Sequence, residues 1–189
     1  MRAQMPVLEA IAHAMTGALN AGGKILWCGN GGSAADSQHM AAELVGRFRR
    51  ERRGLASIAL TTDASILTSV ANDYGFEAVF ARQVEALGNP GDVLVCISTS
   101  GNSPNVVAAL EAARQRGMVT VAFTGQGGGK IAARANHVFA AASRETARIQ
   151  EAHALAGHML CDWIELDSLR AAAAPVTAAA VPADTEAAR

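Results

Sequence analysis

Residues 24–45 read KILWCGNGGSAADSQHMAAELV, and this stretch decides the class of fold. An apolar run, Lys24–Cys28, is followed by a turn of small residues, GNGGS, and then by a segment with the apolar spacing of a helix. The run has the length of a buried strand, and Ser33 belongs to the residue types that cap helix N-termini. The stretch therefore predicts a strand, a glycine-rich loop and a helix, in the order found in βαβ units.

Similar apolar runs, each bounded by small polar residues, alternate with amphipathic segments along the rest of the chain. The further predicted strands are Ser57–Leu60, Val93–Ile97, Val119–Phe123 and a less apolar one, His137–Ala140. Asp63 and Ser103 are expected to cap later helices, and a long final helix is predicted over residues 146–169. This alternation predicts an α/β fold with a parallel sheet, in which ligands bind at the carboxyl ends of the strands.

The composition fits one globular domain. The chain has 189 residues and a formal net charge of -1, so we expect a single domain over residues 1–170 and a disordered Ala/Pro-rich tail over 171–189. A near-neutral chain lacks the net positive electrostatic potential that attracts proteins to nucleic acid. No segment has enough consecutive apolar residues to span a membrane. The three cysteines are far apart in apolar stretches, and the N-terminus does not resemble a signal peptide. We therefore expect a reduced, cytoplasmic protein.

Two loops of small residues are candidate ligand sites. STSGNSP places hydroxyls and free backbone N–H groups at a helix N-terminus, which suits a phosphate without Lys or Arg. The hydroxyls are those of Ser98, Thr99, Ser100 and Ser103. CGNGGSAAD fits the G-x-G-x-x-A form of a dinucleotide fingerprint, but the acidic residue that should follow, Asp63, comes too late. Binding of an anion or a sugar there is favoured over a plain tight turn. TGQGGGKI lacks two required residues of a P-loop, which excludes a P-loop ATPase.

Titratable side chains on two predicted helices are candidates for acid/base chemistry or metal binding. His39 and Glu43 are four residues apart, so both project from one face of their helix. On the final helix, Glu151 is nearly in line with His158, and Gln150 is slightly off that line. If the two helices meet, this ligand set would suit Zn²⁺, although spacing alone does not choose between Gln150 and Glu151. Histidines packed in the core would give the same pattern.

Other polar residues have two interpretations each. The arginine-rich segment RFRRERR, residues 47–53, is expected to form a solvated helix end, where cations offset the helix dipole. Arg47 is predicted to share a helix face with Glu43, four residues before it, and to reach a ligand. Asn72 and Asp73 follow an apolar helix and either cap helix ends or hydrogen-bond to sugar hydroxyls.

These motifs together resemble a known family. The resemblance runs from about residue 21 to residue 167 and is carried by CGNGGSAAD, QHMAAELVGRF, ALTTD, ANDYGFEAVFARQVEALGNPGDVLVCISTSGNSPNVVAAL and RIQEAHALAGH. The chain resembles the sugar isomerase (SIS) superfamily and, within it, the phosphoheptose isomerases. The resemblance implies a three-layer, flavodoxin-like or Rossmann-like fold with a five-stranded parallel sheet. It also implies conversion of sedoheptulose 7-phosphate to D-glycero-D-manno-heptose 7-phosphate through an enediol.

The same resemblance implies roles for individual residues. Glu43 and His158 match the acid/base residues of the family. The ligands of one zinc ion per subunit match His39, Glu43, Gln150 and His158. The substrate-binding residues match Asn30, Gly31, Gly32, Ser33, Glu43, Arg47, Asn72, Asp73, Ser98, Thr99, Ser100, Ser103 and Gln150. Family members form homotetramers with active sites between neighbouring subunits, although the N-terminal helical segment is shorter in this chain.

Two other classes compete with an isomerase. Non-catalytic relatives in the superfamily bind the bacterial replication initiator and lack the helix glutamate that this chain keeps as Glu43. A nucleotide-dependent oxidoreductase would rest on the G-x-G-x-x-A match alone. An isomerase is therefore the favoured hypothesis.

Overall fold

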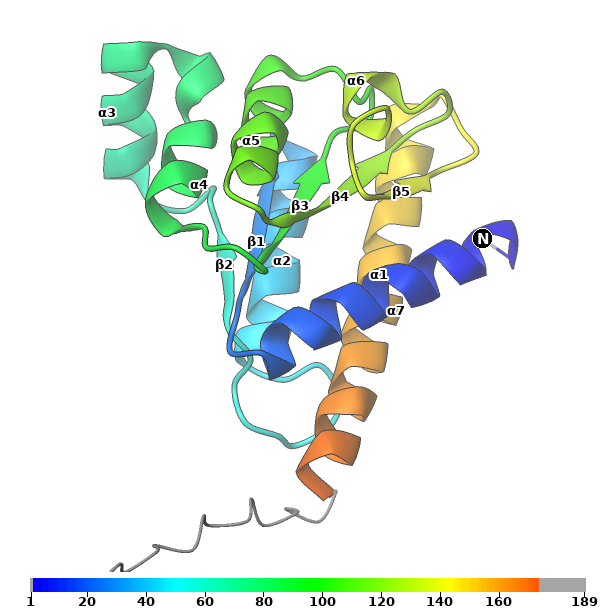
Figure 1. Ribbon diagram of the computed structural model, residues 1–189. Coiled ribbons are helices and arrows are strands. Elements are labelled where there is room, and N and C mark those ends of the chain that lie inside the picture. The colour runs from blue at the N-terminus through cyan, green and yellow to red at the C-terminus, as the bar shows by residue number, and fades with distance from the viewer. Residues whose placement is uncertain (1, 174–189) are drawn as a thin grey trace, which may run out of the picture.

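The computed structural model describes residues 2–173, which alternate between helices and strands (Figure 1). The expected tail at 171–189 lies for the most part outside the described residues, and residues 171–173 continue the last helix, α7 (Thr146–Ala173). Within the described part of the chain, no helix is both long enough and apolar enough to cross a membrane.

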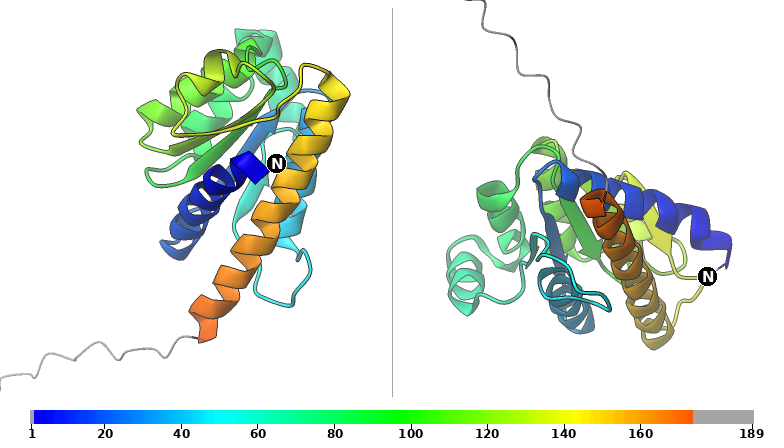
Figure 2. Two further views of the ribbon diagram at one scale, coloured as in Figure 1. Left: turned by 90° about the vertical axis from the view of Figure 1, so that its right-hand side faces the viewer. Right: turned by 90° about the horizontal axis from the view of Figure 1, so that it is seen from below.

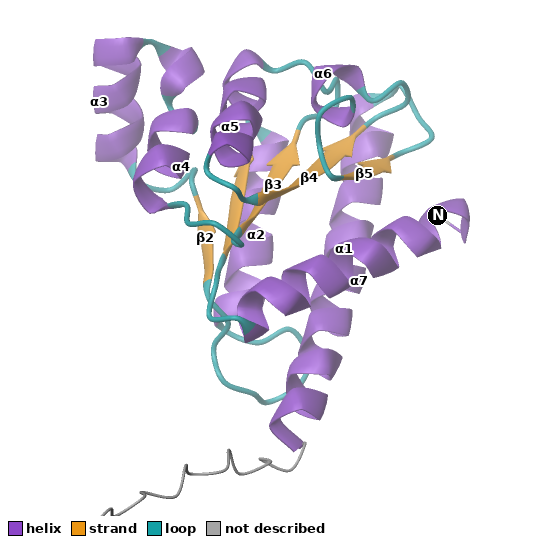
Figure 3. Cartoon of the chain, in the orientation of Figure 1, coloured by secondary structure: helices purple, strands orange, loops and turns teal. Residues whose placement is uncertain are grey.

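Five parallel strands form one sheet in the order β2-β1-β3-β4-β5 (Figure 3). They are β1 (Ile25–Gly29), β2 (Ser57–Ala59), β3 (Val93–Ile97), β4 (Val119–Thr124) and β5 (His137–Ala140). The predicted parallel sheet is confirmed, and its order is that of flavodoxin-like folds. The order reverses between β1 and β3, whose registers pair Leu26 with Leu94 and Cys28 with Cys96.

Helices cover both faces of the sheet (Figure 2). One face packs against α1 (Met5–Asn20), α2 (Gly32–Val45) and α7; the other packs against α5 (Pro104–Gln115) and α6 (Gly129–Ala132), with α4 (Ala81–Leu87) on α5. Alternate side chains of β1 enter the two cores, Trp27 on the α2 side and Leu26 on the α5 side. Because both faces are covered, the strands are continuous apolar runs, which explains why the sequence located them.

Helix α3 (Ala64–Tyr74) lies apart from these layers, on the side of the molecule away from α7 (Figure 1). It is followed by a short 3-10 helix, η2 (Phe76–Ala78), and another, η1 (Arg2–Gln4), precedes α1. Asp63 caps α3 as predicted, because its carboxylate accepts a hydrogen bond from the Ile66 N–H at 2.9 Å. Every residue of α3 is at least partly exposed, including apolar Ile66.

Helices α2 and α7 run side by side in the same direction. Gly157 of α7 faces Met40 of α2 so closely that a Cβ at position 157 would overlap the Met40 sulfur. One turn further along α7, the Cys161 sulfur lies 4.0 Å from the same sulfur atom. The absence of a side chain at Gly157 therefore allows the two helices to approach each other.

Three predictions about the ends of helices are wrong or only partly right. Ser33 does not cap α2, because Gly31, with a φ of 55°, starts the helix at Gly32 and leaves Ser33 in its first turn. Ser103 does stand before Pro104 at the start of α5, but its side chain makes no capping bond. Helix α2 ends at Val45, so Arg47 does not continue the helix face of Glu43.

The arginine-rich segment is also more buried than expected. The side chain of Arg52 is only 2% exposed and its guanidinium binds backbone carbonyls at the end of α2. The prediction of a wholly solvated helix end is therefore wrong.

A buried ion pair joins the starts of two central strands. The Asp92 carboxylate, before β3, accepts hydrogen bonds from Lys24 Nζ at 2.6 Å and from the backbone N–H groups of Lys24 and Asn89 at 2.9 and 2.8 Å. Burial alone would raise the pKa of Asp92, but these hydrogen bonds and the Lys24 charge outweigh it and hold the pKa below its usual value of 3.8. The ionised carboxylate is therefore the form that the fold favours.

Substitution of this carboxylate tests its contribution to stability. D92N should lower the free energy of unfolding by about 1–3 kcal/mol near pH 7, the scale for a buried group left without its partner. Because the folded pKa is lowered, the contribution is fully present above about pH 4 and is lost as the pH falls through the folded pKa. Urea unfolding of both proteins at several pH values measures this. If the difference in free energy of unfolding between the wild type and D92N stayed constant down to pH 2, the account would be contradicted.

Candidate active site

A cavity of about 310 Å³ opens at the carboxyl ends of β1 and β3, where the strand order reverses. This is the place where open α/β sheets bind ligands. Two loops and the start of α7 surround the cavity. Its lining residues are Asn30, Gly31, Gly32, Ser33, Ile97, Ser98, Thr99, Ser103, Thr146 and Gln150. Most of the residues expected to bind substrate are thus brought together; Ser100 is not among the lining residues, and its hydroxyl accepts the Asn102 N–H at 3.1 Å.

The N-termini of three helices meet at this cavity. Gly32 and Ser33 belong to the first turn of α2, Ser103 precedes α5, and Thr146 begins α7. Helix N-termini carry partial positive charge and free N–H groups, which attract anions. The lining residues include no Lys or Arg. Backbone groups and hydroxyls would therefore hold a phosphate ester here.

Paired side chains fix the two loops of the cavity against each other. The amides of Asn30 and Asn105 hydrogen-bond reciprocally, at 2.8 and 2.9 Å, and Asn105 is only 2% exposed. Within the second loop, the hydroxyls of Ser98 and Ser103 lie 3.0 Å apart. No local sequence pattern predicts this role for Asn105, because its partner is 75 positions away.

The glycines at 127–129 support the second loop from behind. Gly101, with a φ of 67°, lies against the Gly128 carbonyl so closely that a Cβ at position 101 would overlap it. The Ile131 N–H donates to the Gly101 carbonyl at 3.1 Å. The TGQGGGKI segment, which is not a P-loop, therefore serves to hold the serine loop.

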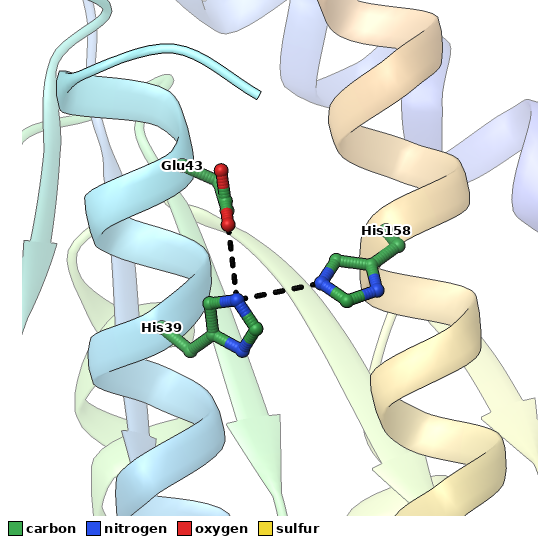
Figure 4. Close-up of side chains that lie close together, drawn as sticks. All are labelled: His39, Glu43 and His158. Atoms are coloured by element: carbon green, nitrogen blue, oxygen red, sulfur yellow. Dashed lines mark hydrogen bonds and ion pairs between the residues drawn. The ribbon is translucent and has the colours of Figure 1, made fainter. Parts of the chain in front are cut away.

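His39 and Glu43 of α2 and His158 of α7 point toward one another in the space between the two helices (Figure 4). His39 Nε2 lies 3.0 Å from Glu43 Oε1 and 3.4 Å from His158 Nε2. One ligand atom from each residue belongs to a group in which no two atoms are more than 4.8 Å apart. The expectation that two helices bring these residues together is confirmed in the geometry.

This group has the chemistry of a divalent metal site. Two imidazole nitrogens and a carboxylate oxygen are typical zinc ligands, at about 2.0–2.2 Å from the ion. Ligands at that distance and at tetrahedral angles lie roughly 3.3 Å from each other, and the two nearest pairs here are 3.0 and 3.4 Å apart. The third pair is within 4.8 Å, so the three residues offer three ligand atoms that could hold one divalent cation.

Asp36 is a fourth titratable residue beside these three, and the sequence patterns did not predict it. It lies one turn before His39 on α2, and its Oδ2 is buried with no hydrogen-bond partner among the described residues. Burial raises the pKa of the Asp36 carboxyl, and the charges of His39 and His158 lower it in part. Spacing could have found it, because residues three apart share a helix face.

The structure separates the two alternatives on α7. Gln150 lines the cavity and lies against Gly32, where a Cβ would overlap its amide. Glu151 forms an ion pair with Arg148 at 2.7 Å on the exposed side of the helix. His153 of the same helix is a core residue: it is 2% exposed and its Nε2 lies 3.1 Å from the Thr124 carbonyl. Burial lowers the pKa of His153, and the Thr124 hydrogen bond opposes this.

Besides Ser100 and Glu43, three more predicted substrate contacts do not line the cavity within this chain. The Arg47 side chain is 61% exposed and lies 3.8 Å from Glu51. Asn72 and Asp73 are exposed at the end of α3, where the Asn72 amide donates to the Asp73 carboxylate at 2.8 Å. Arg47, Asn72 and Asp73 are all absent from the residues that line the cavity.

The fold and the cavity define an α/β protein with a cavity suited to an anion at the switch point of its sheet. Comparison with known proteins agrees: the model of the SIS domain family matches residues 1–125. The phosphoheptose isomerase of Methylibium petroleiphilum is 57% identical over 168 residues, which cover 87% of this chain and 83% of that protein. That of Aquifex aeolicus is 58% identical over 155 residues, covering 82% and 81%.

Solved structures give the same result. The phosphoheptose isomerase of Neisseria gonorrhoeae superposes with a TM-score of 0.82 at 51% identity, covering 86% of this chain and 87% of that one. A phosphoheptose isomerase from Francisella tularensis gives 0.83 at 42% identity, covering 86% of each. The chain therefore belongs to the phosphoheptose isomerase family of SIS-domain proteins.

The amide pair between the loops can be tested directly. N105A leaves the Asn30 amide without its partner and should weaken the binding of a sugar phosphate about tenfold, the effect of one lost hydrogen bond. Isothermal titration calorimetry with sedoheptulose 7-phosphate measures this. N136A is the matched control, because Asn136 also makes amide hydrogen bonds, to Thr120 at 2.9 Å, but does not line the cavity. Equal affinity of both variants would contradict the role of Asn105.

Proposed function

We propose that the chain is an aldose–ketose isomerase that converts sedoheptulose 7-phosphate to D-glycero-D-manno-heptose 7-phosphate. The observation that carries this proposal is the meeting of Glu43 and His158, from two helices distant in sequence, in one group of ligand atoms within 4.8 Å. Membership of the phosphoheptose isomerase family supports the choice of reaction. The cavity bounded by helix N-termini supports a phosphorylated substrate.

The reaction moves one proton between C1 and C2 and another between the two oxygens, through an enediol. In this proposal the Glu43 carboxylate takes the proton from one carbon and returns it to the other. His158 exchanges protons with the oxygens on C1 and C2, which requires a ring nitrogen that is not bound to a metal ion. A carboxylate and an imidazole on opposite helices can act on two sides of a bound sugar, which this reaction requires.

The positions of cavity and acid/base pair suit an extended substrate. Gly32 and His39 are seven residues apart on α2, or about 10 Å along a helix axis. We propose that the loop residues Ser98, Thr99, Ser100 and Ser103 hold the phosphate, while Asn30, Gly31, Gly32, Ser33 and Gln150 hold the sugar. Binding of the remote phosphate then positions C1 and C2 beside Glu43 and His158.

We propose further that His39, Glu43 and His158 hold one Zn²⁺ per subunit, with Gln150 as a fourth ligand. The geometric fit described above supports the first three ligands. Gln150 precedes His158 by eight residues, or about 12 Å of helix, so its amide has to extend along α7 to reach the same ion. A bound zinc ion would supply a Lewis acid for the substrate oxygens.

We propose that the protein forms a homotetramer whose active sites lie between subunits. The exposed apolar side chains around α3 support an interface there: Ile66 is 37% exposed, Tyr74 61% and Phe76 61%. In this arrangement Asn72 and Asp73, which are remote from the cavity of their own chain, contact the substrate of a neighbour. Arg47 is proposed as a further substrate contact.

Two broader proposals concern the whole chain. Residues 1–170 are proposed to form one SIS domain, because both cores pack on a single sheet. A cytoplasmic location is proposed from Cys28, Cys96 and Cys161, which are all free and buried, as is usual in reducing compartments.

The proposed general base has a matched control on the other helix. E43Q should lower kcat with sedoheptulose 7-phosphate by at least about a hundredfold, the usual scale for a general base, while the fold is retained. E151Q should leave kcat unchanged, because Glu151 pairs with Arg148 away from the cavity. Product formation is followed by anion-exchange chromatography. Activity of E43Q equal to that of E151Q would remove Glu43 from the mechanism.

Mixing of inactive variants tests whether sites are shared between subunits. E43Q and D73A should each be inactive alone. If Glu43 and Asp73 of one site come from different subunits, random reassembly of equal amounts restores about a quarter of the wild-type sites. Activity is measured after unfolding and refolding the mixture. No recovery, with tetramers present by light scattering, would place both residues in the same subunit's site.

A further inference from the structure

Glu165 of α7 is a fully buried carboxylate that anchors the segment following α2. It is 0% exposed. Its two oxygens accept the backbone N–H groups of Phe48, Arg49 and Arg50 at 2.8, 3.0 and 3.0 Å. A buried carboxylate is costly unless its lone pairs are satisfied, and here three successive backbone donors satisfy them. Glu165 thereby fixes the course of the chain just after α2.

Arg52 connects Glu165 to the end of α2. Its Nη2 lies 3.5 Å from Glu165 Oε1 and donates to the carbonyl of Glu43 at 2.8 Å. Its Nη1 donates to the carbonyl of Gly46 at 2.9 Å. These carbonyls belong to the carboxyl end of α2, where backbone acceptors lack helical partners and cations are favourable. Arg52 thus holds the turn of α2 that carries Glu43.

Phe48 connects Glu165 to His158. The Phe48 ring stacks on the imidazole of His158, with centroids 5.2 Å apart and planes inclined by 20°. The His158 ring also meets the His39 ring edge-on, with centroids 4.9 Å apart and planes inclined by 80°. Since the Phe48 N–H is bound by Glu165, the position of this ring depends on the buried carboxylate.

We propose that Glu165 is a positioning residue that holds Glu43 and His158 in their facing arrangement. It acts through Arg52 on the backbone of Glu43 and through the Phe48 ring on the imidazole of His158. Glu165 is 0% exposed and cannot contact a substrate directly, so its effect is on geometry. The role rests on the proposed function, because the reaction requires both groups on one substrate.

The test compares E165Q with two other variants. Gln has the size of Glu but lacks its charge and presents an amide NH₂ to the three backbone donors. F48L keeps Glu165 and an apolar side chain but removes the ring over His158. D92N is the control for stability, because Asp92 is also a buried carboxylate that accepts backbone N–H groups and pairs with a basic side chain, outside this network.

Two readouts are measured for each purified full-length variant. The first is kcat and KM with sedoheptulose 7-phosphate, below the melting temperature of every variant. E165Q and F48L should lower kcat about ten- to a hundredfold, as for a misplaced reacting group, and change KM less than about threefold. The second is the NMR resonance of the His158 ring proton, identified by its loss in H158Q. This resonance should shift in both variants, because the stacked ring of Phe48 moves or is absent.

The D92N control shows whether a loss of activity in E165Q comes from misplaced side chains or from lower stability. D92N should lose stability but keep the wild-type kcat and the His158 resonance. The proposal is overturned if E165Q folds and keeps kcat or the resonance at the level of D92N. Should E165Q fail to fold, F48L decides alone, and a wild-type kcat or resonance in F48L overturns the proposal. If the wild type itself does not convert sedoheptulose 7-phosphate, the proposed function fails, and the resonance alone then decides the positioning role.

Discussion

The close, same-direction contact between α2 and α7 is the constraint on which the rest of the site depends. It is possible because Gly157 has no side chain where Met40 lies, and Cys161 packs on the same methionine. Helices at this separation bring residues 119 positions apart, His39 and His158, within 3.4 Å. The convergence of a carboxylate and two imidazoles is thus a result of helix packing, and the buried Glu165 secures the carboxyl-terminal end of the contact.

The strand order of the sheet determines where the cavity lies. Because β1 and β3 are neighbours at the point where the strand order reverses, the loops after them flank one cavity. Three helices begin there, so an anion finds backbone N–H groups in place of basic side chains. Helix α2 starts at this cavity and carries His39 and Glu43 further along its length. In the proposed function, the phosphate and the reacting end of the substrate therefore lie along one helix.

The sequence predicted the sheet well because doubly covered strands are unbroken apolar runs, and it predicted His39, Glu43 and the serine loop because each is a local pattern. What it missed depends on long-range contacts. Asn105 pairs with Asn30, and Glu165 binds backbone groups more than 110 positions away, which no spacing rule reveals. Ser33 failed as a cap because the positive φ of Gly31 starts α2 earlier, and Arg47 left its expected face because α2 ends at Val45. The final helix was predicted over residues 146–169 and begins at Thr146 as expected. The choice between Gln150 and Glu151 depended on how this helix packs, which spacing along the chain does not show.

A crystal structure of E43Q with sedoheptulose 7-phosphate bound would test the central claim most directly. The account predicts density for the phosphate at the loop of Ser98 and Ser103, and C1 and C2 of the sugar in the gap between residue 43 and His158. A sugar whose C1 and C2 point away from the α2–α7 gap, with the phosphate elsewhere, would contradict it.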